Sequence, residues 1–80
     1  MIVSTAADWG NVVRDRRIEL GLTQAELARR VGRARQWVVR FESGFAGSAS
    51  VDSLLAVLDI LDLYVEVGET DEDTTNLDER

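Results

Sequence analysis

The sequence of 80 residues has no cysteine and no histidine. Without these side chains, thiol nucleophiles, imidazole general bases and the usual zinc ligands are excluded. Carboxylate catalysis needs acids that converge in a cleft, and here the acids are densest in the C-terminal segment. The composition therefore predicts a protein that is not an enzyme and that holds no metal and no cofactor.

Disulfide pairs and long apolar runs are also missing. The first absence favours a reducing, cytoplasmic location. The second argues against a transmembrane helix, which needs about 18 consecutive apolar residues, and no signal-peptide pattern opens the chain. A chain of 80 residues is one small domain, and a second subunit would add useful buried surface.

Charge is distributed unevenly along the chain. The formal net charge is −6, which by itself argues against a nucleic-acid ligand. Residues 14–40, however, hold eight arginines against three acids, a local charge of +5, whereas residues 41–80 hold eleven acids against Arg80, or −10. A nucleic-acid footprint is a local basic patch, so the central segment is a candidate for one.

Hydrophobic periodicity divides most of the chain into short helices. Trp9, Val13 and Leu20 share one face of the first helix, which we expect Asp8 to cap and Gly21 to end. The predicted fold class is all-α, with four to five short helices and one C-terminal β-strand. The further helices are expected over residues 24–31, 34–43 and 50–61, with Gly44 ending the third helix and Ser50 capping the fourth.

The start of the second helix is the strongest local signal. Thr23 and Glu26 have the spacing of a capping box, in which the hydroxyl and the carboxylate each satisfy one free backbone amide. Leu22 and Leu27 add a hydrophobic staple around the same cap. Gly32 ends the helix after about two turns, which leaves a tight turn before the third helix.

The domain organisation follows from these elements. We expect a flexible N-terminus at residues 1–7, a folded domain at residues 8–67 and a disordered acidic tail at residues 68–80. Three roles are open for the tail: it aids solubility, it offers a protease-sensitive handle, or its charge repels phosphate and lowers DNA affinity.

Two short helices joined by a tight glycine turn are the sequence form of a helix-turn-helix unit. Ala28 allows the next helix to cross closely, and the apolar residues Leu27, Val31, Val38 and Phe41 would close the core. From Val12 to Leu61 the chain resembles the Cro/cI (Xre) helix-turn-helix family, which implies a lambda-repressor-like fold. The resemblance is carried by Leu22–Ala28, Val31–Gly32, Gln36–Val38 and Phe41–Gly44.

The resemblance implies roles in binding double-stranded DNA. Gln24, at the N-terminus of its helix, would contact a phosphate, and the third helix would lie in the major groove. Arg35, Gln36 and Val39 point away from the core stripe and are the candidates to contact guanine, adenine and thymine. The predicted DNA-binding residues are Gln24, Arg33, Ala34, Arg35, Gln36, Trp37, Val39 and Arg40.

Four side chains, two of them among these DNA-binding residues, have roles that the pattern leaves open or assigns to structure. Arg40 could reach a base or a phosphate, or be a solvated arginine. Trp37 is expected to pack at the core edge with some phosphate contact. Arg17 lies on the apolar face of the first helix, and the resemblance pairs it with Glu42 in a partly buried structural ion pair.

The predicted strand suggests a dimer. Leu63, Val65 and Val67 alternate with Tyr64 and Glu66, and no other segment offers a strand to pair with them. The simplest partner is the same strand of a second copy, which would place two recognition helices on a palindromic operator. A fifth helix or a frayed end is the alternative.

Four short helices followed by this strand and an acidic tail make the chain similar to HipB-like antitoxins. The length of the chain and the runs Arg35–Val38 and Arg40–Glu42 add to that similarity. That resemblance implies a homodimer that represses its own operon and binds a HipA-like serine/threonine kinase toxin. The shorter N-terminus and a tail without an aromatic anchor depart from that subfamily. A stand-alone Xre-type regulator is the alternative, and a helical module that contacts only proteins is the third interpretation.

Overall fold

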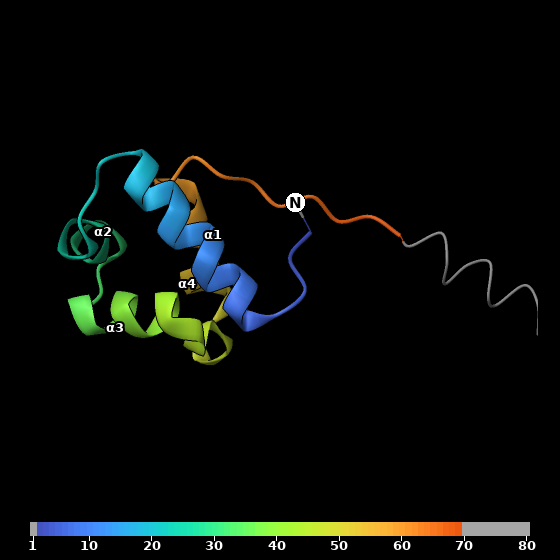
Figure 1. Ribbon diagram of the computed structural model, residues 1–80, viewed down its shortest axis with the longest axis horizontal. Coiled ribbons are helices and arrows are strands. Elements are labelled where there is room, and N and C mark those ends of the chain that lie inside the picture. Colours follow the sequence, from blue (N-terminus) through green and yellow to red (C-terminus); the bar gives the residue numbers. More distant parts are fainter. Residues whose placement is uncertain (1, 70–80) are drawn as a thin grey trace, which may run out of the picture.

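The computed structural model describes residues 2–69, in which the helices pack together and the C-terminal segment extends away from them (Figure 1). Helices are the only regular secondary structure within residues 2–69, so the all-α fold class is confirmed. In chain order the elements are α1 (Ala6–Glu19), α2 (Gln24–Val31), α3 (Arg35–Arg40), the π-helical turn η1 (Phe41–Phe45), the 3₁₀ turn η2 (Ala46–Ser48) and α4 (Val51–Ile60).

The first helix begins earlier than its sequence pattern predicts. Thr5 is the N-cap: its hydroxyl accepts from the Asp8 backbone N–H at 3.1 Å, and Asp8 lies within the first turn. The expectation that Asp8 caps the helix is therefore wrong, because Asp8 is instead the carboxylate partner of a capping box. Ala6 and Ala7 are helical, and Ala6 packs against the core, so the folded part includes residues that we expected to be flexible.

The capping boxes of α1 and α2 also shift the acidity of their carboxyl groups. Backbone N–H groups of Ser4 and Thr5 donate to Asp8 Oδ2 at 2.9 and 3.1 Å, and these bonds hold the pKa of Asp8 below its usual value. The Thr23 backbone N–H donates to Glu26 Oε1 at 2.9 Å and likewise lowers the pKa of Glu26. Both helix starts are therefore most stable when their carboxyl groups are ionised.

The second helix and its turn follow the local sequence signals. The Thr23 hydroxyl accepts from the Glu26 backbone N–H at 3.0 Å, which confirms the predicted capping box. Gly32 ends the helix with a φ of 80°, in the left-handed region that glycine adopts without steric cost. Its N–H donates to the Ala28 carbonyl at 2.9 Å, so the turn into α3 is closed by hydrogen bonds.

The third helix is shorter and ends differently from the expected helix over residues 34–43. Regular α-helix covers Arg35–Arg40, and the chain then forms the wider turn η1. Gly44 breaks this turn with a φ of 104°, which confirms it as the residue that ends the helical run. Ser50 then caps α4 through a hydroxyl that accepts from the Ser53 backbone N–H, also as predicted.

All four helices contribute to one core. Gly10 of α1 lies so close to η1 that a Cβ atom there would be 2.6 Å from the Phe41 carbonyl oxygen. This close approach brings the apolar faces of the helices together, and burial of that surface stabilises the fold. The buried apolar residues are Val13, Leu27, Ala28, Val38, Phe41, Ala46, Val57, Leu58 and Leu61.

After α4 the chain becomes extended. Residues 63–69 leave the helical body, and no other part of residues 2–69 forms strand pairing with them. The strand expected over Leu63–Val67 was to pair with a second copy, so it stays a prediction. Most of the expected acidic tail, residues 70–80, lies outside the described residues.

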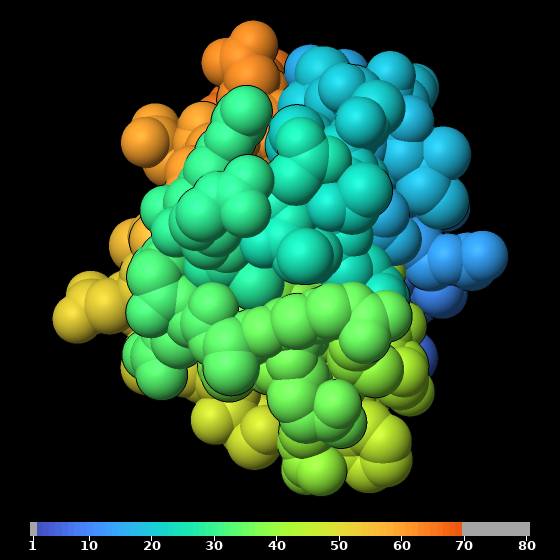
Figure 2. Space-filling model, turned by 90° about the vertical axis from the view of Figure 1, so that its left-hand side faces the viewer, coloured from blue at the N-terminus to red at the C-terminus, as the bar shows by residue number. Residues whose placement is uncertain are grey.

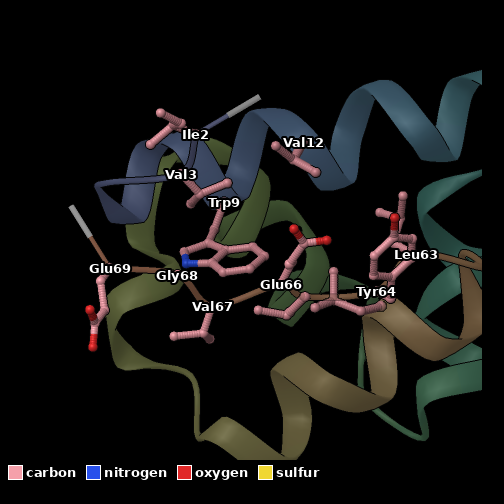
Figure 3. Close-up of a pocket in the computed structure, with 12 residues that line it drawn as sticks. Ile2, Val3, Trp9, Val12, Leu63, Tyr64, Glu66, Val67, Gly68 and Glu69 are labelled. Carbon is pink, nitrogen blue, oxygen red and sulfur yellow. The ribbon is translucent and has the colours of Figure 1, made fainter. Parts of the chain in front are cut away.

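The extended segment borders an apolar trough. Figure 3 shows the Trp9 indole in it, with Val12 on the same helix and Leu63 and Val67 on the extended segment. Ile2, Val3, Leu58 and Val65 also contribute to the apolar lining. No helix within residues 2–69 has the length and apolar composition that crossing a membrane requires.

Candidate nucleic-acid interface

Helices α2 and α3 lie side by side on one face of the molecule, with the residues after α3 along its lower rim (Figure 2). The Gly32 turn sets their relative direction, and the buried side chains of Leu27 and Val38 hold them together. This geometry leaves the other side of α3 facing solvent. Such an exposed second helix is the element that enters the major groove in helix-turn-helix proteins.

The outward side of α3 carries most of the predicted DNA-binding residues. Val38 points into the core. Val39 and Trp37 are half-buried, so they lie at the edge of the solvent-exposed surface of α3. Five of the predicted residues are exposed, and four of these five have polar or charged side chains. The exposed residues are Arg33, Ala34, Arg35, Gln36 and Arg40.

Gln24 connects the start of α2 to the start of α3. Its amide oxygen accepts a hydrogen bond from Arg35 Nη2 at 3.2 Å, and its amide nitrogen donates to Glu42 Oε1 at 3.2 Å. Because an ionised carboxylate only accepts hydrogen bonds, Glu42 fixes which end of the Gln24 amide faces Arg35. Gln24 thus orients Arg35, a role that its predicted phosphate contact did not include.

The ion pair expected between Arg17 and Glu42 is present. Arg17 Nε and Nη2 donate to the two carboxylate oxygens at 2.7 and 2.9 Å, and Nη1 donates to the Leu22 carbonyl at 2.8 Å. Only 11% of the Arg17 side chain and 3% of the Glu42 side chain are exposed. The hydrogen bonds from Arg17 to Glu42 raise the pKa of Arg17 above its usual value, so the pair stays charged and fastens α1 to η1.

Arg33 is directed toward α4 in the structure. Its Nη2 donates to the buried Ser53 hydroxyl at 2.6 Å, and its guanidinium lies 5.6 Å from the centre of the Trp37 ring. The Trp37 ring in turn packs at 5.3 Å from the Phe41 ring, so Trp37 takes the core-edge position expected for it. No local pattern indicates a role for Ser53, because its partner Arg33 lies 20 residues away along the chain.

Arg40 is the last residue of α3, and its side chain is exposed. Its guanidinium lies 5.3 Å from the centre of the Phe45 ring, within the range of a cation–π contact. Phe45 is not among the residues that the sequence predicts for the interface. The signal in the sequence is an aromatic residue directly after Gly44, five positions from Arg40.

The residues predicted to form the dimer strand lie together in the extended segment. Leu63 is half-buried against the core, whereas Tyr64, Val65, Glu66 and Val67 are exposed. Tyr64 is 86% exposed and Val67 is 90% exposed, which is unusual for large apolar side chains in a small domain. This segment lies away from α3, so the two predicted surfaces are separate (Figure 1).

Comparisons with known proteins agree with this architecture. A family model described as "Helix-turn-helix domain" matches residues 9–71. A curated "Uncharacterized HTH-type transcriptional regulator" of Methanothermobacter thermautotrophicus is 54% identical over 33 residues. The match covers 41% of this chain and 48% of the relative, so the chain matches about half of that protein's length.

Solved structures show the same fold at low sequence identity. "HipB-O4 20mer complex" has a TM-score of 0.76 at 20% identity and covers 88% of this chain and 97% of that one. "Structure of HipA-HipB-O2-O3 complex" has a TM-score of 0.77 at 21% identity, with coverage of 88% and 97%. "Crystal Structure of Apo-HppE" has a TM-score of 0.70 at 22% identity and covers 75% of this chain but 33% of that one. The fold therefore occurs both as nearly a whole chain and as a third of a longer one.

Proposed function

This chain belongs to the helix-turn-helix domain family, in its Cro/cI (Xre)-like group, and on that premise we propose that it is a sequence-specific transcriptional repressor that binds a palindromic operator as a homodimer. The family makes the chain a DNA-binding regulator. Repression, the operator and the dimer are the proposal. The proposal gives the chain no catalytic role, in keeping with the absence of cysteine and histidine, and places it in the cytoplasm.

One observation carries the proposal: the exposed side of α3 presents Arg35 and Gln36 next to each other at the start of the helix. Arginine can donate two hydrogen bonds to guanine, and glutamine can bond adenine through both ends of its amide. In helix-turn-helix proteins the N-terminal residues of the second helix face the base edges. Arg35 and Gln36 are therefore the residues that would select the operator.

The test is a selection of bound duplexes from a random pool, followed by titration of the selected duplex by fluorescence anisotropy. Arg35→Ala and Gln36→Ala should each weaken binding by about 1–3 kcal/mol and relax the preference at one base pair. Arg14→Ala is the matched control, since Arg14 is an exposed arginine of α1 outside the helix-turn-helix unit. A wild-type chain that selects no duplex would overturn the proposal in favour of a module that contacts only proteins.

The dimer is proposed from the extended segment and the trough beside it. The segment offers backbone amides and carbonyls to a second strand, and Tyr64 and Val67 expose large apolar surface. Figure 3 shows the side chains of Tyr64 and Val67 on this segment. Pairing with the same segment of a second copy would satisfy the backbone groups and cover this apolar surface.

Val65→Pro tests the dimer, because proline removes a backbone donor from the centre of the segment. It should convert the dimer to a monomer in sedimentation equilibrium, whereas the control Val65→Thr keeps a β-branched side chain and should stay dimeric. A wild-type chain that is monomeric at concentrations well above those used for DNA binding would refute this part of the proposal.

We further propose that the chain is the autoregulating antitoxin of a type II toxin–antitoxin pair, whose toxin is a HipA-like serine/threonine kinase. The fold similarity to HipB, including HipB in a complex with HipA, supports this. Purification of the tagged chain from its native cells tests it. A kinase-like protein recovered in fixed proportion would support the antitoxin, whereas the chain alone, bound to its own promoter, would favour the alternative of a stand-alone regulator.

A further inference from the structure

We infer that Phe45 is a positioning residue of the DNA interface, whose ring holds the Arg40 guanidinium so that it can donate hydrogen bonds to a backbone phosphate of the bound duplex. The inference rests on the proposed DNA binding and adds to it a residue outside α3. It also assigns Arg40 to a phosphate, where the sequence left a base or a phosphate open.

Phe45 has no role in the core that would explain it. It lies in η1 after Gly44 and is 58% exposed, although its neighbours Phe41 and Ala46 are both buried. Its ring instead lies 5.3 Å from the Arg40 guanidinium. The left-handed conformation of Gly44, with a φ of 104°, redirects the chain just before Phe45.

Arg40 keeps its positive charge available. Residues 2–69 form two ion pairs, Arg16–Glu19 and Arg17–Glu42, and Arg40 is in neither. A ring face attracts a guanidinium without neutralising its charge, because the attraction comes from the ring quadrupole. A cation–π contact uses none of the guanidinium N–H groups as hydrogen-bond donors, so they stay available, and phosphate oxygens match their geometry.

The position of Arg40 favours a phosphate over a base. Arg40 is the last residue of α3, whereas the base-reading candidates Arg35 and Gln36 are the first two. The start of a recognition helix faces the base edges, so its end and the turn after it lie closer to the sugar–phosphate backbone. Arg33 near the start of α3 also lies on a ring, but it donates to Ser53 as well and is less free.

The experiment titrates the selected duplex and a random duplex with Phe45 variants over a range of salt concentrations. Phe45→Leu and Phe45→Ala should weaken binding to both duplexes about two- to five-fold, since leucine is apolar but has no ring to hold Arg40. Losing one phosphate contact should also reduce the slope of log affinity against log salt by up to about 0.9. Phe45→Tyr keeps the ring and should bind as the wild type does.

A second pair of variants separates Phe45 from Arg40. In an Arg40→Ala background, Phe45→Leu should have no further effect, because the ring then has no guanidinium to position. Wild-type affinity and salt slope for Phe45→Leu, or an undiminished loss in the Arg40→Ala background, would overturn the inference while DNA binding stands. Failure of the wild type to bind any duplex would overturn the proposed function itself. Thermal unfolding should be equal for all Phe45 variants, as expected of an exposed side chain.

Discussion

The arginines of α1 and the arginines around α3 are held in place by different kinds of partner. On α1, Arg16 and Arg17 bond to carboxylates. Around α3, the partners are an amide, a hydroxyl and aromatic rings, all of which are neutral. The neutral contacts are Arg33 with Ser53 and Trp37, Arg35 with Gln24, and Arg40 with Phe45.

This difference follows from what each arginine has to do. A carboxylate fixes an arginine but also cancels its charge, which suits a side chain that joins two elements of the fold. A neutral partner fixes the guanidinium and leaves the charge uncancelled, which suits a side chain that must meet a phosphate or a base. The chain has a net charge of −6, yet Arg33, Arg35 and Arg40 take part in neither of the two ion pairs formed within residues 2–69.

The largest effect is expected on the carboxylate side. Glu42→Ala leaves Arg17 buried without its partner, which should lower the free energy of unfolding by about 3–5 kcal/mol. Urea unfolding followed by circular dichroism measures this loss. Glu19→Ala is the control: its pair with Arg16 is exposed, and its loss should be about 0.2–0.5 kcal/mol. Equal losses in the two variants would show that the buried pair contributes no more to the free energy of unfolding than the surface pair does.

Exchanging a neutral partner for a charged one comes next. Gln24→Glu places a carboxylate where the Gln24 amide now faces both Arg35 and Glu42. It should repel Glu42, hold Arg35 away from DNA and weaken operator binding about tenfold, or about 1.4 kcal/mol. Gln24→Leu removes the same hydrogen bonds without adding charge and should lose less affinity. If both variants bind alike, the neutrality of the partner is unimportant.

Arg33 does not follow the division between arginines that join elements of the fold and arginines that face DNA. Its partners are neutral, yet it joins α4 to the turn before α3. Arg33→Ala should lower the free energy of unfolding by about 1 kcal/mol through loss of its bond to Ser53. It should also weaken DNA binding less than Arg35→Ala does. Thermal unfolding and anisotropy titrations of the same samples measure the two effects. An unchanged stability with a full loss of binding would place Arg33 wholly on the DNA face.

The smallest effect is a pH dependence of stability. Asp8 and Glu26 have folded-state pKa values below their ordinary values of 3.8 and 4.5. Their contribution is therefore complete above the ordinary values and is lost as the pH falls through the lower folded-state values. Urea midpoints measured from pH 6 down to pH 3 should fall, and less so in the variant with Asp8→Asn and Glu26→Gln. An equal fall in that variant would assign the acid sensitivity to other carboxylates.

Sequence reasoning succeeded where the signal was local. The start of α2 at Thr23 and its end at Gly32 depend on residues within one or two turns, and both were predicted. The pairing of Arg17 with Glu42 was also expected, because a charge on an apolar helix face needs a partner and the family resemblance named one.

The contacts that sequence reasoning missed join residues that lie apart in the chain or across an irregular turn. Nothing near Arg33 indicates Ser53, and the contact of Gly10 with the Phe41 carbonyl exists only once α1 crosses η1. The turn at Phe41–Phe45 is π-helical, and hydrophobic periodicity does not distinguish such a turn from a regular α-helix. Because of this turn, Phe45 lies beside Arg40.

Residues 63–69 extend from the helices on the side away from α3 (Figure 1). This arrangement bears on the rate at which the protein associates with DNA. This segment carries Glu66 and Glu69, whereas Arg33, Arg35 and Arg40 lie around α3, and these separated charges give the molecule an electric dipole. Within the Debye length of a duplex, about 10 Å at 0.1 M salt, the field of the phosphates would turn such a dipole with α3 forward. Encounters that begin in a wrong orientation can then be corrected before contact, and the gain appears in the association rate rather than in the lifetime of the complex.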